Sequence, residues 1–105
     1  MSYKWPNKDK DEIQDYSVDW SRFLGDDTIS STTWFIDDAS DVKTQVSATD
    51  VVYGLQAVSF TNTTTVATIR LSLGTNNIRY KITCQIQTAE GLQFERSIFL
   101  RVKEK

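Results

Sequence analysis

Apolar and polar residues alternate along several stretches of the chain, which is the period of a β-strand with one buried face. The clearest stretch is 78–87, and turn residues 89–91, with Gly91 free to adopt a positive φ, separate it from a second stretch at 93–103. The inward positions expected for this pair are Ile78, Tyr80, Ile82, Cys84, Ile86, Phe94, Ile98, Leu100 and Val102. The two stretches predict a C-terminal β-hairpin.

Shorter segments of the same kind precede this hairpin. Residues 15–21 place Tyr16, Val18 and Trp20 on one face, and residues 64–73 are expected to point Ala67, Ile69, Leu71 and Leu73 inward. The other segments expected to form strands are 28–36, 42–47, 51–53 and 55–60, with Asp37 to Asp41 ending the first of them. About seven short strands, turn signals roughly every 8–12 residues and no helical period predict an all-β protein, an immunoglobulin-like antiparallel β-sandwich.

The first fourteen residues differ from the rest, because charges of both signs surround only a few apolar groups. Pro6 restricts Trp5 to an extended conformation and removes a backbone donor. We therefore expect an extended N-terminal arm at 1–14 and a sandwich domain at 15–105. Trp5 has two interpretations: an anchor for another protein, or a ring that packs back on its own sandwich and protects a sheet edge.

Individual residues refine this picture. Trp20 and Trp34 fall on core faces, so we expect them to be core anchors and not exposed platforms for a ligand. Tyr80 follows a turn, where sandwiches often use a tyrosine hydroxyl to bond the backbone. Phe99 interrupts the polar outer face of the last strand and is a candidate contact residue. Arg96 occupies an inward position, which indicates either a bulge or a site where its guanidinium reaches water at the end of the sandwich.

Composition and charge exclude several classes of function. The 12 basic and 14 acidic residues are spread along the chain, so no basic face and no nucleic-acid partner are expected. No apolar run is long enough for a membrane span, and the N-terminus lacks a secretory signal, so we expect a soluble protein without Sec export and without a membrane partner. Cys84, the single cysteine, is expected to be a buried and inert thiol.

Catalysis and metal binding are not expected. The chain has no histidine, which is the commonest general base and metal ligand. Aspartates could gather at loops around a calcium ion, but their spacing matches no recognised calcium loop and is typical of solvated turns. These residues are Asp26, Asp27, Asp37, Asp38, Asp41 and Asp50. No catalytic residue, cofactor or metal ligand is therefore predicted.

Several motifs extend over nearly the whole chain. They are Lys4-Trp5-Pro6-Asn7-Lys8-Asp9-Lys10-Asp11-Glu12, Asp15-Tyr16, Asp19-Trp20, Asp26-Asp27-Thr28-Ile29-Ser30 with Trp34, Ile82, Thr88-Ala89-Glu90-Gly91 and Glu95-Arg96. With these motifs the chain resembles the fibre-tail adaptor proteins, a family of small immunoglobulin-like virion proteins of tailed phages. The resemblance implies a structural protein of the virion, assembled in the host cytoplasm, that joins a tail or head–tail component to a fibre or a neighbouring virion protein.

A stiff sandwich with a polar arm fits such a role, since the arm could order on a neighbour and repeated copies in a symmetric particle would add weak contacts together. The candidate partner-binding residues are Tyr3, Trp5, Pro6 and Phe99. Two alternatives stay open. A carbohydrate- or ligand-binding module predicts an exposed Trp20 or Trp34, and a capsid decoration protein would share the fold and the arm but contact the shell.

Overall fold

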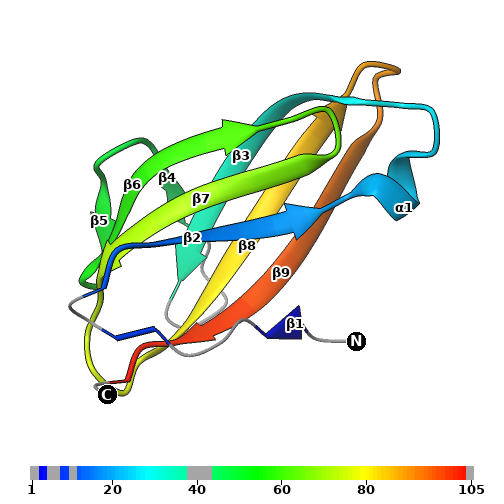
Figure 1. Cartoon of the computed structure of the whole chain (residues 1–105). Coiled ribbons are helices and arrows are strands. Elements are labelled where there is room, and N and C mark those ends of the chain that lie inside the picture. Colours follow the sequence, from blue (N-terminus) through cyan, green and yellow to red (C-terminus); the bar gives the residue numbers. More distant parts are fainter. Residues whose placement is uncertain (1–2, 5–7, 10–11, 38–43, 104–105) are drawn as a thin grey trace.

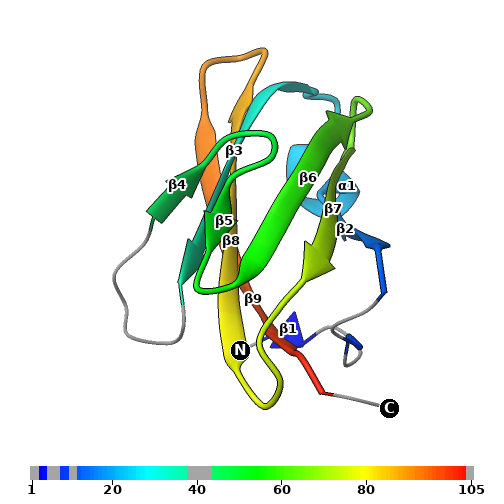
Figure 2. The same cartoon turned by 90° about the vertical axis from the view of Figure 1, so that its left-hand side faces the viewer.

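The computed structural model describes residues 3–4, 8–9, 12–37 and 44–103. Their strands form two sheets packed face to face, as Figures 1 and 2 show. One sheet has the order β1 (Tyr3–Lys4), β9 (Gln93–Arg101), β8 (Arg79–Thr88), β3 (Ile29–Asp37) and β4 (Thr44–Val46). The other has the order β2 (Gln14–Asp19), β7 (Val66–Leu73), β6 (Leu55–Asn62) and β5 (Val51–Val52). A single short helix, α1 (Ser21–Leu24), follows β2 in the described chain.

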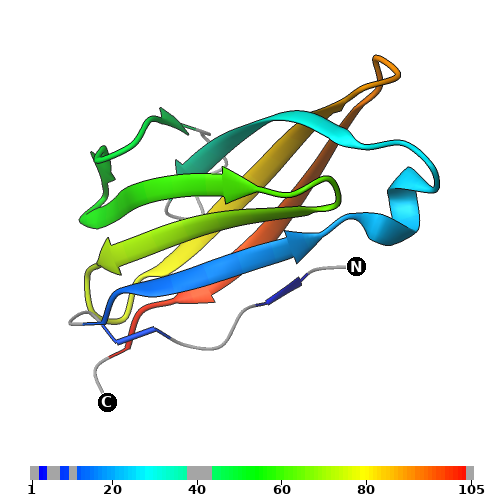
Figure 3. The ribbon, with the colours of Figure 1, turned by 45° about the horizontal axis from the view of Figure 1, so that its top comes forward.

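The strand order is that of an immunoglobulin-like sandwich, which confirms the predicted fold. β2, β7 and β6 take the places of strands B, E and D, while β9, β8, β3 and β4 take those of G, F, C and C′. These neighbours pair antiparallel, whereas β1 runs parallel to β9, with Tyr3 opposite Ile98. Figure 3 shows β1 beside β9 at the edge of its sheet.

The core lies between the two sheets and is filled by the alternating residues of both. Trp20 at the end of β2 and Trp34 on β3 are only 2% and 1% exposed, so both are core anchors as expected. Trp34 stacks on Phe60 of the opposite sheet, with ring centroids 6.4 Å apart and planes 10° from parallel. Stacked aromatic rings of this kind bury large apolar areas and fix the separation of the sheets.

Tyr80 forms the expected corner at the start of β8. Its hydroxyl donates to the carbonyl of Tyr53 at 2.6 Å and accepts the backbone N–H of Thr75 at 2.9 Å. The side chain is fully buried, so these two bonds satisfy a hydroxyl that would otherwise be costly inside the core. They also tie the turn after β5 to the turn before β8.

Three local expectations need correction. Leu73 is 51% exposed with φ of 60°, because the left-handed backbone at the end of β7 turns its side chain outward, and Ser72 is buried in its place. β3 extends one residue further than expected, since Asp37 is still part of the strand and pairs with Lys81. The chain also contains α1, although no helical period was found; one turn is too short to show one.

β9 forms no bulge at Arg96, because β8 and β9 pair without a register shift. Its side chain lies half-buried at the end of the sandwich near α1, in agreement with the second interpretation. Asp38, Asp41, Trp5 and Pro6 lie outside the described residues. In the part of the chain that is described, no helix is long and apolar enough to cross a membrane.

Candidate functional site

The edge of the larger sheet brings two of the predicted contact residues together. Tyr3 and Lys4 of β1 pair with Ile98 and Phe99 of β9, so the backbone of Tyr3 runs next to Phe99. Phe99 is half-buried on the outer face of the sheet, and the Arg79 guanidinium carbon lies 4.0 Å from the centre of its ring. Phe99 is therefore one part of a surface shared with cationic residues. Whether Tyr3 and Phe99 contact a partner stays a prediction.

Lys8 attaches the N-terminal segment to the sandwich. Its side chain is fully buried, and its ammonium group donates to the carbonyls of Asp9 at 2.8 Å and Leu73 at 2.7 Å. Its backbone N–H donates to Arg101, and its carbonyl accepts from Lys103, on either side of a parallel bridge to Val102. Residues 8–9 thus lie beside residues 101–103, next to the C-terminal end of the described chain.

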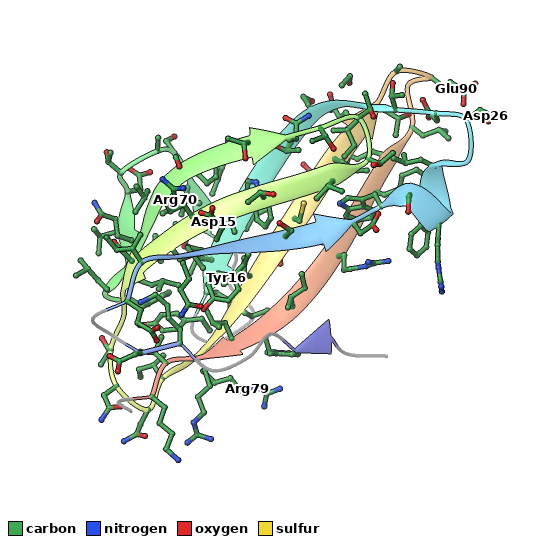
Figure 4. The ribbon with its side chains drawn as sticks, in the orientation of Figure 1. Asp15, Tyr16, Asp26, Arg70, Arg79 and Glu90 are labelled. Carbon is green, nitrogen blue, oxygen red and sulfur yellow. The ribbon has the colours of Figure 1, made fainter. Side chains whose placement is uncertain are left out.

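Four cationic residues share the outer face of the sheet with Phe99. The even spread of charges along the sequence did not predict this local group. The four residues are Arg79, Lys81, Arg101 and Lys103, which we call the basic block together with Phe99. Arg79 pairs with Arg101 and Lys81 pairs with Phe99 across β8 and β9, so the side chains share the outer face. Figure 4 shows Arg79 at this end of the sheet, away from the Arg70–Asp15 pair. The alternation within each strand was visible in the sequence, but the cross-strand register was not.

The opposite end of the molecule holds a second cluster, formed by α1 and the sheet edge below it. Phe23 of α1 lies with its ring centroid 5.9 Å from that of Trp20 and 6.5 Å from that of Phe94. The Arg96 guanidinium lies 4.9 Å from the ring centre of Trp20 and 4.7 Å from that of Phe23. Cation–π contacts of this kind compensate a charged group for partial burial.

The aspartate loops are organised as turns. The Asp50 carboxylate accepts the N–H of Ser47 at 2.8 Å, and the Asp27 carboxylate accepts the N–H groups of Thr28 and Glu90. A hydrogen bond from the Thr88 side chain, together with these backbone donors, holds the pKa of Asp27 below its usual value. Within the described ranges, no three acidic, cysteine or histidine residues lie close enough together to hold a metal ion.

Cys84 has the chemistry of a core residue. Burial raises the pKa of its thiol to about 12, while contact with Trp20 and the positive charge of Arg96 act weakly in the opposite direction. A thiol with this pKa is protonated at neutral pH and is a poor nucleophile. The expectation of a buried thiol is met, since Cys84 is fully inaccessible.

Most of the exposed large apolar side chains also lie at the ends of the domain. One end, where β2 begins and β7 stops, carries the side chains of Ile13, Val51, Tyr53 and Leu73. The other end, which carries α1, has Phe23 and Leu92. Tyr53 and Leu73 both have positive φ, which is unusual for side chains of this size. The molecule therefore presents apolar groups at both ends of its longest dimension of 41 Å.

Comparison with known proteins agrees with the resemblance seen in the sequence. No curated protein matches the chain. A family model described as the podophage GP4 fiber-tail adaptor protein gp77 matches residues 8–101. That range begins at the buried Lys8 and includes every strand from β2 to β9. The chain therefore belongs to the family of the podophage GP4 fiber-tail adaptor protein gp77.

Proposed function

We propose that the chain joins a tail or head–tail component of a podophage virion to a fibre or to a neighbouring virion protein. Its family makes it a structural component of the virion and supports a role without catalysis. The single observation that carries the proposal is the family match over 8–101, which includes every strand from β2 to β9. Assembly in the host cytoplasm, in several copies around a symmetric particle, belongs to the same proposal.

The physical properties of the domain support an adaptor. A sandwich with a continuous core transmits force between its ends without needing a bound ligand to hold it together. Residues 1–7 precede the Lys8 attachment, and we propose Tyr3, Trp5 and Pro6 of this segment as contacts for a neighbouring protein, with Phe99 next to them on the sheet. Multiple copies would allow weak individual contacts to sum to firm attachment.

A carbohydrate-binding module has less support. That reading needs an exposed Trp20 or Trp34, and both side chains are buried in the core. A capsid decoration protein shares the fold and remains the alternative that the experiment must separate. The two readings differ in which assembly binds the purified domain: tails or tail-containing particles for an adaptor, and tail-less capsids for a decoration protein.

Co-sedimentation with particles that lack the protein tests the proposal. We expect the full chain to bind tail-containing particles at a fixed stoichiometry and not to bind tail-less capsids. A chain without residues 1–7 should remain folded and lose binding, because the cut leaves Lys8 and β2 in place. Removing residues 1–14 would be less informative, since Lys8 is buried and Gln14 belongs to β2.

Point substitutions refine this comparison. Trp5→Ala should weaken binding to tail-containing particles, while Ile13→Ala, which removes an exposed apolar side chain outside the proposed contact, should not. Binding of the full chain to capsids alone would favour the decoration protein. Binding to neither assembly would refute the adaptor role, and equal binding of the full and shortened chains would move the contact from the arm to the sandwich.

A further inference from the structure

The basic block brings cationic side chains together on the outer face of one sheet. Arg79 and Arg101 are direct cross-strand partners on the outer face, and like charges at such positions destabilise a sheet. Lys103 lies two residues beyond Arg101, and Lys81 lies two residues beyond Arg79, on the same side. Arg79, Arg101 and Lys103 are exposed, and Lys81 is half-buried.

The cations of this block differ from those elsewhere on the domain. Arg70 forms a two-point ion pair with Asp15 at 2.8 and 3.2 Å, and Arg96 stacks against two aromatic rings. Within the described part of the chain, by contrast, no carboxylate bonds the side chains of Arg79, Arg101 or Lys103. The block is therefore a local excess of positive charge on a chain whose net charge is −2.

The contact between Arg79 and Phe99 orders one of the exposed cations of the block. With its guanidinium carbon 4.0 Å from the ring centre, the side chain gives up part of its rotational freedom before any partner arrives. A guanidinium held in this way keeps N–H donors in a planar fork that matches a carboxylate. Phe99 adds an apolar surface beside it, and aromatic and arginine side chains are enriched where protein interfaces bind most strongly.

We infer that the basic block binds a carboxylate-rich segment of a neighbouring virion protein, an inference that rests on the proposed adaptor function. Charge complementarity carries this choice of partner, because Arg79, Arg101 and Lys103, which no described carboxylate bonds, share the outer face of the sheet with Phe99. A duplex nucleic acid fits less well, since a net negative protein repels an extended polyanion at long range, whereas a short acidic segment needs only the local field.

The test reverses one charge of the block and compares it with a matched reversal at the other end of the molecule. Arg101→Glu places a carboxylate opposite Arg79, so the fold should keep its melting temperature or gain slightly. Binding to tail-containing particles that lack the protein should weaken about tenfold, and wild-type binding should weaken with added salt. Arg22→Glu, on the exposed surface of α1, should bind like the wild type.

Failure of this inference can be distinguished from failure of the adaptor role. If the wild type binds particles and Arg101→Glu binds equally well, the inference is wrong and the adaptor role stands. If the wild type does not bind particles, the adaptor role is refuted. A direct titration then tests whether the basic block binds a carboxylate-rich peptide. In that titration a hexaglutamate peptide is added to the labelled full chain, and backbone amide shifts are followed at residues 79, 81, 99 and 101.

The titration has a clear positive and negative result. Shifts confined to the basic block, absent in Arg101→Glu and retained in Arg22→Glu, support the inference. Absence of such shifts at millimolar peptide, or a stronger response to a short DNA duplex of equal charge, would overturn it.

Discussion

Gly74 shows how a single position can hold together two parts of the sandwich. It follows β7 with φ of +115°, and its N–H donates to the carbonyl of Gly54 at 2.9 Å. A Cβ at this position would lie 2.7 Å from a methyl carbon of Val102, which is fully buried. Both the backbone conformation and the close approach of Val102 therefore require glycine here.

Substitution of Gly74 is expected to be far more harmful than substitution of a glycine with only a conformational requirement. Gly74→Ala should lower the free energy of unfolding by about 2–4 kcal/mol, because backbone strain and a core clash add together. Gly91→Ala is the matched control: its φ is +85°, but nothing lies within 4 Å of the added methyl, so about 1 kcal/mol is expected. Urea denaturation of both variants measures the difference, and equal losses would contradict the clash.

The Cys84 thiol makes stability depend on pH in the alkaline range. Its pKa rises from 9.0 in the free thiol to about 12 in the folded protein, so the folded state holds the proton more tightly. The stabilisation is complete below pH 9 and is lost as the pH rises toward 12. Between pH 9 and 10 we expect the free energy of unfolding to fall by about 1 kcal/mol from this group alone.

Cys84→Ala isolates this contribution, because alanine does not titrate. Its unfolding free energy will start lower, owing to the lost core contacts, but should fall less between pH 9 and 10 than that of the wild type. The comparison stops at pH 10, since burial also raises the pKa of Tyr16 to about 12 and adds a loss in the same direction above its normal value of 10.0. Parallel curves for the two proteins would show that the thiol does not titrate differently on folding.

At the scale of elements, the alternation of apolar and polar residues predicted the strands well but predicted neither the exposed Leu73 nor the short helix α1. The hairpin of β8 and β9 follows the expected pattern, because one buried face imposes the same period on both strands. The exposed Leu73 departs from it, because a left-handed residue at the end of β7 reverses the alternation. The single turn of α1 has no period, and its position depends on the contact of Phe23 with Trp20, which no local pattern encodes.

Arg96 joins α1 to the sheet, and its geometry predicts a difference between arginine and lysine. Arg96→Lys should lower the free energy of unfolding by about 1 kcal/mol, because a compact ammonium cannot stack on the rings of Trp20 and Phe23 as a planar guanidinium does. Arg22→Lys, on the exposed side of α1, should change it by less than about 0.5 kcal/mol. Thermal or urea unfolding of the pair decides the matter, and equal values would mean that charge alone holds Arg96 in place.

At the scale of the whole molecule, the candidate surface could be predicted only in part. Phe99 stood out as an apolar residue on a polar face, but its cationic neighbours come from the register of β8 with β9. The position of Tyr3 beside it comes from a parallel pairing between residues at opposite ends of the chain. Pairings of such long sequence separation depend on the assembled core and leave no local trace in either segment.

The buried Lys8 is an attachment point of the N-terminal segment, and this leads to a prediction about truncation. Removing residues 1–7 takes away the two paired residues of β1 and should cost at most about 1 kcal/mol of unfolding free energy. Removing residues 1–9 should cost about 2–4 kcal/mol more, because the Leu73 carbonyl loses a charged donor and the buried surface at Val102 is opened.

Lys8→Met separates the two causes of that larger loss. It retains most of the buried side-chain volume and the backbone bonds to Arg101 and Lys103, while it removes the ammonium group from Leu73. Its unfolding free energy should therefore lie between those of the two truncated chains. A value equal to that of the wild-type chain would show that the ammonium group contributes no net stability and that burial alone attaches the segment, because desolvation of the charge would then offset its hydrogen bonds.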